Sequence, residues 1–285
     1  MKFSIIIPAH NEEKVIGKCL KSLKSQKTED VEIILVNDGS TDRTVKIAKK
    51  MRILDKIINF DKGHSAAFAR NAGAKIARGE YLIFLDADQI AEKNFIKKIK
   101  QFLQNEKVDA TDYLVYSYKP KTIFQKAWSA FRKYHPSVGF PHIIKRKVFR
   151  ELHGFKEKIF YYEDDDLKER FLKACYSFKG PVNAKVYHIE PENWSDFVRQ
   201  RKWQTKGILS VLKEKRRMVI LKYFVPTLLL PLCYFSFLPL LIYFVYFWLR
   251  YSIKTKEAVN SFLWVVLDYI GRFISLFYFC KELIV

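Results

Sequence analysis

A short apolar segment that ends in two carboxylates constrains this chain more than any other feature. Residues 82–85 form an uninterrupted apolar run, short enough for a buried strand, and Asp86 and Asp88 follow it directly. Alternate residues of an extended chain point the same way, so both carboxylates can face one cation. Two hard oxygen ligands at the carboxyl end of a strand suit Mg²⁺ or Mn²⁺ carrying a diphosphate. A D-x-D sequence alone also fits a solvated turn, so the neighbouring segments must decide.

Two earlier segments predict further strands of the same sheet. Residues 3–8 are an apolar strand that stops at a proline, and residues 31–36 are a second apolar strand that runs into a polar turn. Helices between such strands give βαβ units and a parallel sheet. We expect Ser40 or Thr41 to cap the helix after the second strand, and Asp42 to favour its first turn.

A glycine turn precedes the strand that ends in the two carboxylates. From Gly63 the chain continues as a helix of small residues that carries Arg70, and the strand at 82–85 comes directly after it. Polar loops bearing Glu12 and Asp38 follow the first two strands. Because the carboxyl ends of parallel strands lie at one edge of a sheet, these acids and bases are expected along one edge.

Four of these motifs together resemble one enzyme family. P-A-H-N-E-E at 8–13, V-N-D-G-S-T-D at 36–42, the G-x-x-x-A-x-A-R-N-x-G run at 63–73 and L-D-A-D at 85–88 resemble the inverting family 2 glycosyltransferases of the GT-A fold. The resemblance continues more loosely over about residues 1–210, where 163–170 looks like the acceptor-side motif E-D-x-D-L-x-x-R. It implies an α/β fold, with a GT-A, Rossmann-like, mixed and mostly parallel sheet flanked by helices. To this fold the apolar C-terminal segments, described below, add predicted C-terminal transmembrane helices.

The resemblance implies a donor pocket and a metal. Asp38 would hydrogen-bond the nucleobase, and Arg70 suits the donor pocket or its acidic neighbours. The donor-binding residues implied are Pro8, Ala9, Asn11, Glu12, Asp38, Arg70 and Asp86. Asp88, with Asp86 beside it, would hold a divalent metal (Mg²⁺ or Mn²⁺) that neutralises the departing nucleoside diphosphate, and His188 would be a further ligand.

The resemblance also places a general base and an acceptor side. Asp164 matches the family's base position, but four consecutive acids leave open which carboxylate of 163–166 is the base. Asp166 orients its neighbours or pairs with Arg170. Residues 199–203 look like the Q-x-x-R-W element of processive synthases with both polar positions changed, which puts processivity in doubt. The acceptor or pyrophosphate side implied comprises Glu163, Arg199, Arg201 and Trp203.

The C-terminal part reads as a membrane anchor. Residues 223–249 carry no charge and exceed the ~20 residues needed to span a bilayer. A second apolar stretch at 258–280 is interrupted only by Asp268 and Arg272, whose i, i+4 spacing allows them to pair. The predicted domains are a glycosyltransferase domain at 1–215 (nucleotide-sugar half 1–90, acceptor half 91–215) and a membrane-anchoring region at 216–285. Basic residues before 223 predict a catalytic domain that faces the cytoplasm. The basic residues between the two apolar stretches would face outward if 223–249 crossed the membrane once. Whether 223–249 crosses the membrane or re-enters it therefore stays open.

Composition and net charge limit the classes of partner that the chain is expected to bind. The net charge is +21, from 51 basic and 30 acidic residues, and 49% of residues are hydrophobic. The charge is dispersed and no nucleic-acid-binding motif is present, which excludes nucleic acid as the expected partner. The basic residues before the apolar segment favour an anionic membrane surface instead. Four scattered cysteines indicate neither a zinc site nor a disulfide framework.

These observations predict one function and leave one alternative. The expected protein is a membrane-anchored, metal-dependent inverting glycosyltransferase. It would move a sugar from a UDP- or GDP-sugar to a lipid or lipid-linked glycan acceptor. The alternative is a non-catalytic relative that binds nucleotide sugar or scaffolds a glycan-assembly complex. A nucleotide-sugar pyrophosphorylase would need a G-x-G-T-R-type opening, which residues 8–13 lack.

Overall fold

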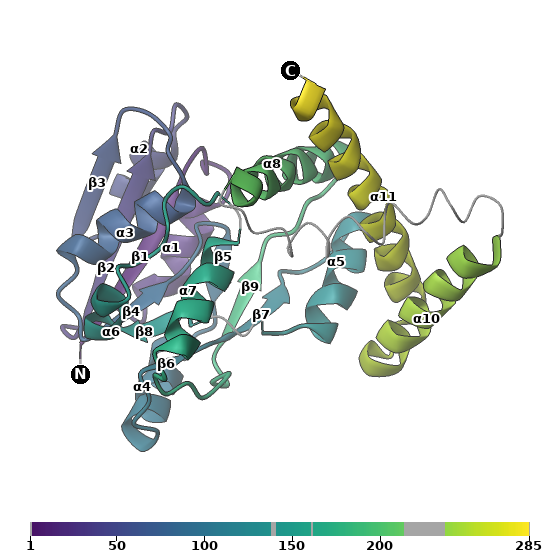
Figure 1. Cartoon of the computed structure of the whole chain (residues 1–285). Helices are drawn as coiled ribbons and strands as arrows, with labels where there is room; N and C mark the ends of the chain where they lie inside the picture. The colour runs from purple at the N-terminus through teal and green to yellow at the C-terminus, as the bar shows by residue number, and fades with distance from the viewer. Residues whose placement is uncertain (1, 138–140, 161, 214–236, 285) are drawn as a thin grey trace. The chain divides into compact units, whose positions relative to one another are not determined.

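The structure is a computed structural model that describes residues 2–137, 141–160, 162–213 and 237–284 (Figure 1). The chain divides into two compact units. The first comprises Met1–Tyr116, Ser137–Glu157 and Glu163–Ile189, and the second comprises Ser117–Pro136, Lys158–Tyr162 and Glu190–Val285. The predicted domain boundary at residue 215 lies outside the described residues and stays a prediction.

A six-stranded mixed sheet is the centre of the first unit. In spatial order its strands are β3 (Lys56–Phe60), β2 (Val31–Asp38), β1 (Phe3–Ala9), β4 (Tyr81–Phe84), β8 (Ile143–Lys145) and β6 (Ala110–Thr111). The first four are parallel to one another, and β8 runs antiparallel to both β4 and β6. A second sheet has the order β5 (Gln89–Ala91), β9 (Lys185–His188) and β7 (Leu114–Ser117). The predicted α/β fold with a mixed, mostly parallel sheet is confirmed.

Helices cover both faces of the larger sheet because its central strands are apolar on both sides. Ile5 and Ile7 of β1 belong to one buried cluster, and Ile6 between them belongs to the other. The first cluster includes residues of α1 (Ile16–Lys24), α2 (Thr44–Lys50) and α4 (Phe95–Asn105). The second includes residues of α3 (Ala66–Ile76), α6 (Arg146–Glu151) and α7 (Glu163–Lys173).

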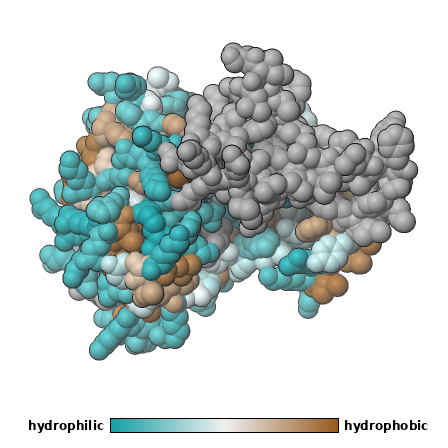
Figure 2. All heavy atoms as spheres, viewed as in Figure 1, coloured by the Kyte–Doolittle hydropathy of each residue, from teal (hydrophilic) through white to brown (hydrophobic). Residues whose placement is uncertain are grey.

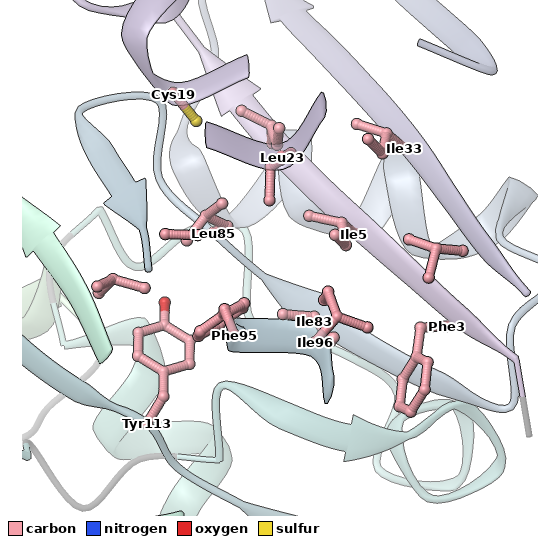
Figure 3. Packing of buried hydrophobic residues seen from close by; sticks show 14 of the residues in the cluster. Phe3, Ile5, Cys19, Leu23, Ile33, Ile83, Leu85, Phe95, Ile96 and Tyr113 are labelled. Carbon is pink, nitrogen blue, oxygen red and sulfur yellow. The ribbon is translucent and has the colours of Figure 1, made fainter. Parts of the chain in front are cut away.

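Figure 3 shows the first cluster from close by. Ile5, Ile33 and Ile83 come from three adjacent strands and share this cluster with Leu23 of α1 and Phe95 of α4. All five side chains are at most 1% exposed. This rigid layer holds the carboxyl ends of β1, β2 and β4 in fixed register, so the polar loops that follow them have fixed starting points.

The helix after β2 begins later than its expected caps. The helix α2 begins at Thr44, and no side chain caps it at the preceding residue. Asp42 instead accepts a hydrogen bond from the Thr44 backbone N–H at 2.9 Å. The prediction that Ser40 or Thr41 caps this helix was therefore wrong. Both residues bind a neighbouring loop instead.

Four helices form the described core of the second unit. They are α5 (Ile123–Tyr134), α8 (Trp194–Lys213), α10 (Phe237–Thr255) and α11 (Ala258–Ile284). Aromatic pairs join α5 to α11 and to α10: the rings of Trp128 and Trp264 lie 4.4 Å apart, and those of Tyr134 and Tyr251 lie 4.2 Å apart.

Along α11, the Arg272 side chain donates a hydrogen bond to Asp268 at 2.9 Å, which confirms their predicted pairing. Of the helices that the structure describes, none is both long and apolar enough to cross a bilayer. The prediction of C-terminal transmembrane helices is therefore not supported in that part of the chain. Of the predicted segments, 223–236 lies outside the described residues, whereas 258–280 falls within α11.

Candidate active site

The loops that follow β1 and β2 are hydrogen-bonded to each other. Asn11 lies in the left-handed region, with φ of 58°, and its backbone N–H donates to Ser40 Oγ at 2.9 Å. The Asn11 side chain in turn accepts from the Thr41 backbone N–H at 2.8 Å. Pro8 and Ala9 at the end of β1 fix where this loop starts. The loops therefore form one assembly at the carboxyl edge of the sheet.

The loop after β3 joins this assembly through Asp38. The buried Asp38 carboxylate accepts from the His64 backbone N–H at 2.9 Å, and His64 Nδ1 lies 2.9 Å from its other oxygen. The His64 ring stacks on Phe68, with 4.1 Å between ring centres. His10 Nδ1 lies 2.6 Å from the Asp38 backbone oxygen. These contacts fix the direction of the carboxylate that is predicted to bind the nucleobase.

Sequence reasoning did not single out His10 or His64. Their signal was available, because each lies beside a motif residue: His10 within P-A-H-N-E-E, and His64 after the turn glycine. Gly39, in the loop after β2, packs closely against the turn at Gly63. Its φ is +71°, and a Cβ at this position would collide with the backbone of Lys62 and Gly63.

Glu12 holds a proton more tightly than an ordinary glutamate. Burial is the main cause, and the charges of Asp88 and Asp86 add to it, so the pKa of Glu12 rises from 4.5 to about 8. Its backbone N–H donates to Thr44 Oγ1 at 2.7 Å, which fixes the residue between the first two loops. The field of the two aspartates therefore extends to the predicted nucleoside pocket.

Arg70 connects the two acidic motifs. One end of its guanidinium donates to Asp86 Oδ1 at 2.8 Å and the other end donates to Glu163 Oε1 at 2.7 Å, although these glutamate and arginine residues are 93 positions apart. The Arg70 side chain is 15% exposed. The same guanidinium also lies over the Phe155 ring, 5.6 Å from its centre. Arg70 thus fixes the start of α7 relative to the end of β4.

The pKa values of the two carboxylates bound by Arg70 shift in opposite directions. Burial acts to raise the pKa of Asp86, but the neighbouring guanidinium outweighs it and the pKa is lowered. At Glu163, burial prevails over the same guanidinium and raises the pKa to about 7. Of the two partners of Arg70, Asp86 therefore gives up its proton more readily than Glu163 does.

Asp88 has the atom that best fits a metal ion. Its Oδ1 is buried and has no hydrogen-bond partner among the residues that the structure describes, and its Oδ2 lies 3.1 Å from His188 Nε2. The Ile189 backbone N–H donates to the Asp88 carbonyl at 3.0 Å, which holds the end of β9 against this loop. The described part of the chain contains no group of three or more metal-ligating side chains. Because Mg²⁺ commonly takes one or two carboxylates and completes its shell with phosphates and water, Asp88 fits such an ion, and His188 lies directly beside it.

The acidic start of α7 separates into buried and accessible carboxylates. Glu163 and Asp166 are buried. Arg170 lies 2.6 Å from Asp166, which confirms the predicted pairing of these two residues. Asp164 is partly exposed and accepts from the Asp165 backbone N–H at 3.1 Å, and Asp165 is exposed. Asp164 is therefore the accessible carboxylate directly beside the Arg70–Glu163 pair, and its role as base stays a prediction.

A histidine–aspartate pair near β4 was missed by sequence reasoning. His142 Nδ1 lies 2.6 Å from the fully buried Asp112, and its ring packs on Tyr113 with 4.6 Å between ring centres. The Tyr113 hydroxyl donates to the Phe84 carbonyl at 2.8 Å, just before the D-x-D sequence. The charge of His142 also contributes to the lowered pKa of Asp86. No motif spacing connects residues 30 positions apart, so only the fold reveals this pair.

The predicted acceptor-side residues of α8 belong to the second unit. Arg199 is exposed and pairs with Asp196 at 2.6 Å. Arg201 is buried, with its guanidinium 5.0 Å from the centre of the Phe197 ring. The side chain of Trp203 lies outside the described residues. The acceptor-side roles of these three residues stay predictions.

Comparison with known proteins gives a family for most of the first unit. Residues 4–171 match the family model described as "Glycosyl transferase family 2", which is more than half of the chain. The putative glycosyltransferase EpsH of Bacillus subtilis (strain 168) is 32% identical over 199 residues, which cover 67% of this chain and 54% of EpsH. The chain therefore spans about half the length of that relative.

Two solved structures share the fold. Residues 1–349 of S. aureus TarS in complex with UDP superpose with a TM-score of 0.54 at 20% identity, covering 98% of this chain and 89% of that one. The mannosyltransferase PcManGT from Pyrobaculum calidifontis, in complex with GDP-Man and Mn²⁺, gives a TM-score of 0.56 at 15% identity. It covers 74% of this chain and 64% of that one. At these identities the likeness concerns the fold.

Proposed function

The chain belongs to glycosyl transferase family 2, and on that premise we propose that it transfers a sugar, with inversion, from a nucleoside-diphosphate sugar to a lipid or lipid-linked glycan acceptor. The observation that carries this proposal is the bridge made by Arg70. It joins Asp86 of the D-x-D sequence to Glu163 at the start of α7. A donor-side carboxylate and an acceptor-side motif are thereby held within one ion-pair network.

The donor proposed is a UDP- or GDP-sugar. Asp38, oriented by His64, is a fixed acceptor for an imide or amide N–H of the nucleobase. TarS was solved with UDP and PcManGT with GDP-Man and Mn²⁺, which supports a nucleotide-sugar donor and leaves both bases open. Asp88 and His188 would hold the divalent ion, which supplies positive charge to the departing diphosphate.

In the proposed transfer step, Asp164 is the general base. Its carboxylate takes the proton of an acceptor hydroxyl while that oxygen forms a bond to the anomeric carbon. The bond from the anomeric carbon to the diphosphate oxygen breaks, and the nucleoside diphosphate leaves with that electron pair. The Arg70–Glu163 ion pair fixes the first turn of α7, so it orients Asp164 without touching the reacting atoms.

A lipid acceptor and a membrane location are part of the proposal. The net charge of +21 supports an anionic surface as partner, and the basic residues that precede residue 223 support a catalytic domain on the cytoplasmic side. A lipid or lipid-linked acceptor would be presented at such a surface. The acceptor and the location are independent of the donor chemistry and require separate tests.

The test of the donor chemistry is a panel of UDP- and GDP-sugars, incubated with the purified full chain, Mn²⁺ and an extract of bacterial lipids. We expect release of nucleoside diphosphate from one donor, a labelled lipid product, and loss of both on adding EDTA. A protein that binds UDP or GDP but releases no diphosphate with any donor would support the non-catalytic alternative. A protein that binds neither nucleotide would overturn the proposal.

A further inference from the structure

Large apolar side chains are exposed at the turn that joins α10 to α11 in the second unit. We name this surface the α10–α11 patch. Its residues and their exposed fractions are Tyr246 (54%), Leu249 (46%), Ile253 (78%), Val259 (73%) and Phe262 (47%). Figure 2 shows hydrophobic residues exposed toward the lower right, where Figure 1 places this turn. Contiguous exposed apolar surface of this kind marks an interaction site more often than an isolated apolar residue does.

Helical spacing places these side chains on one stripe of each helix. Tyr246, Leu249 and Ile253 follow i, i+3, i+7 on α10, and Val259 and Phe262 follow i, i+3 on α11. The rings of Trp248 and Phe262 lie 6.3 Å apart and join the two helices. The two stripes therefore belong to helices that pack on each other beside the turn.

Other residues of the same helices satisfy the internal core. Tyr251 and Trp264 are at most 9% exposed and belong to the aromatic cluster of the second unit. Among the residues that the structure describes, the aromatic core of that unit is thus built without the patch. Its apolar side chains face outward at positions where a polar residue would preserve the helix equally well.

The charges beside the patch are basic. Arg250, Lys254 and Lys256 are exposed on the last turn of α10 and the connector. Tyr134 holds the first two in place: Lys254 Nζ donates to its carbonyl at 2.6 Å, and Arg250 bonds its hydroxyl. The one acid of the connector, Glu257, is paired with Lys133. An apolar stripe with fixed cations around it is complementary to an anionic, half-apolar partner.

We propose that the α10–α11 patch docks on the surface of an anionic lipid bilayer, with Ile253 and Val259 in the headgroup–acyl boundary. Amphipathic helices that lie in this boundary combine apolar insertion with Lys and Arg contacts to anionic lipids. The contact is interfacial and needs no membrane-spanning helix. Its purpose, access to a lipid acceptor, rests on the proposed function, but the docking itself can be measured without sugar transfer.

The test is flotation of the purified full chain with vesicles of phosphatidylcholine alone or with added phosphatidylglycerol. The double variant Ile253→Glu/Val259→Glu should bind the anionic vesicles at least about tenfold more weakly. The triple variant Arg250→Gln/Lys254→Gln/Lys256→Gln should lose about fivefold per charge, and high salt should reproduce that loss. Leu172→Glu is the matched control: this α7 residue is 55% exposed but lies in the first unit, and its variant should bind as the wild type does.

Several outcomes would overturn the docking proposal. They are equal binding of wild type and the double variant, equal binding to neutral and anionic vesicles, or no binding by the wild type. Light scattering addresses a second copy of this chain as the partner: a dimer that the double variant dissociates, with vesicle binding unchanged, would also overturn it. UDP-induced thermal stabilisation separates the two proposals. The double variant should retain it, whereas its absence in the wild type would concern the donor site alone.

Discussion

Replacing Glu12 with glutamine is expected to stabilise the first unit at alkaline pH. In the unfolded chain Glu12 loses its proton near its ordinary pKa of 4.5, whereas in the fold burial and the nearby Asp88 and Asp86 raise the pKa to about 8. Between these two values the folded state binds more protons than the unfolded state. The free energy of unfolding therefore falls as the pH rises.

The size of the effect follows from the gap between the two pKa values. Each pH unit within the gap costs about 1.4 kcal/mol, so the wild type should lose roughly 4 kcal/mol between pH 5 and pH 8 through Glu12. Glu12→Gln removes the titration and should abolish this loss. Glu13→Gln is the matched control. Arg43 lowers the pKa of Glu13, so the ionisation of Glu13 causes no loss of stability as the pH rises.

The assay must report on the first unit. All five tryptophans lie in the second unit, so their fluorescence is unsuitable. Amide hydrogen exchange of β1 and β2, in EDTA and across pH 5 to 8, measures the opening of the sheet itself. After correction for the pH dependence of intrinsic exchange, the stability difference between Glu12→Gln and the wild type should widen with pH. Parallel curves for the two proteins would refute the reasoning.

Three other changes test the site. Asp164→Asn should lower kcat by about two or more orders of magnitude in steady-state kinetics, while its affinity for UDP, measured by calorimetry, stays near that of the wild type. Asp165→Asn should have almost no effect on kcat. Normal turnover in Asp164→Asn would place the base elsewhere. Arg70→Gln leaves two carboxylates without their shared cation and should destabilise the sheet by about 2–3 kcal/mol, measured by hydrogen exchange. This is less than for a fully buried ion pair, because the Asp86 side chain is 39% exposed. An unchanged exchange rate would contradict the bridge. Asp88→Ala should abolish the extra thermal stabilisation that Mn²⁺ adds to UDP, and retention of that increment would remove Asp88 from the metal site.

The strands and the D-x-D edge were predictable because their signals are local. An apolar run, a terminating proline or acid and a following helix are all contained within about a dozen residues. The pairs Asp166–Arg170 and Asp268–Arg272 were predictable for the same reason, since i, i+4 neighbours meet on any helix.

The contacts that assemble the site were not predictable because they are long-range. Arg70 was expected in the donor pocket or beside its acidic neighbours, but its choice of Asp86 and Glu163 depends on how α3 and α7 pack on the sheet. The Asp112–His142 pair needs the antiparallel pairing of β6 with β8. The cap of α2 failed as a prediction because another loop uses the hydroxyls that were expected to provide it.

The most direct test of the proposed transfer compares the wild type and Asp164→Asn in one reaction with the donor identified by the panel. Proton NMR of the mixture reports the anomeric configuration of the product and the amount of nucleoside diphosphate released. We expect the wild type to release one diphosphate per sugar transferred, with inverted configuration. The variant should bind the donor equally well and release about a hundredfold less. Retained configuration, or equal release by both proteins, would contradict single-step transfer with Asp164 as the base.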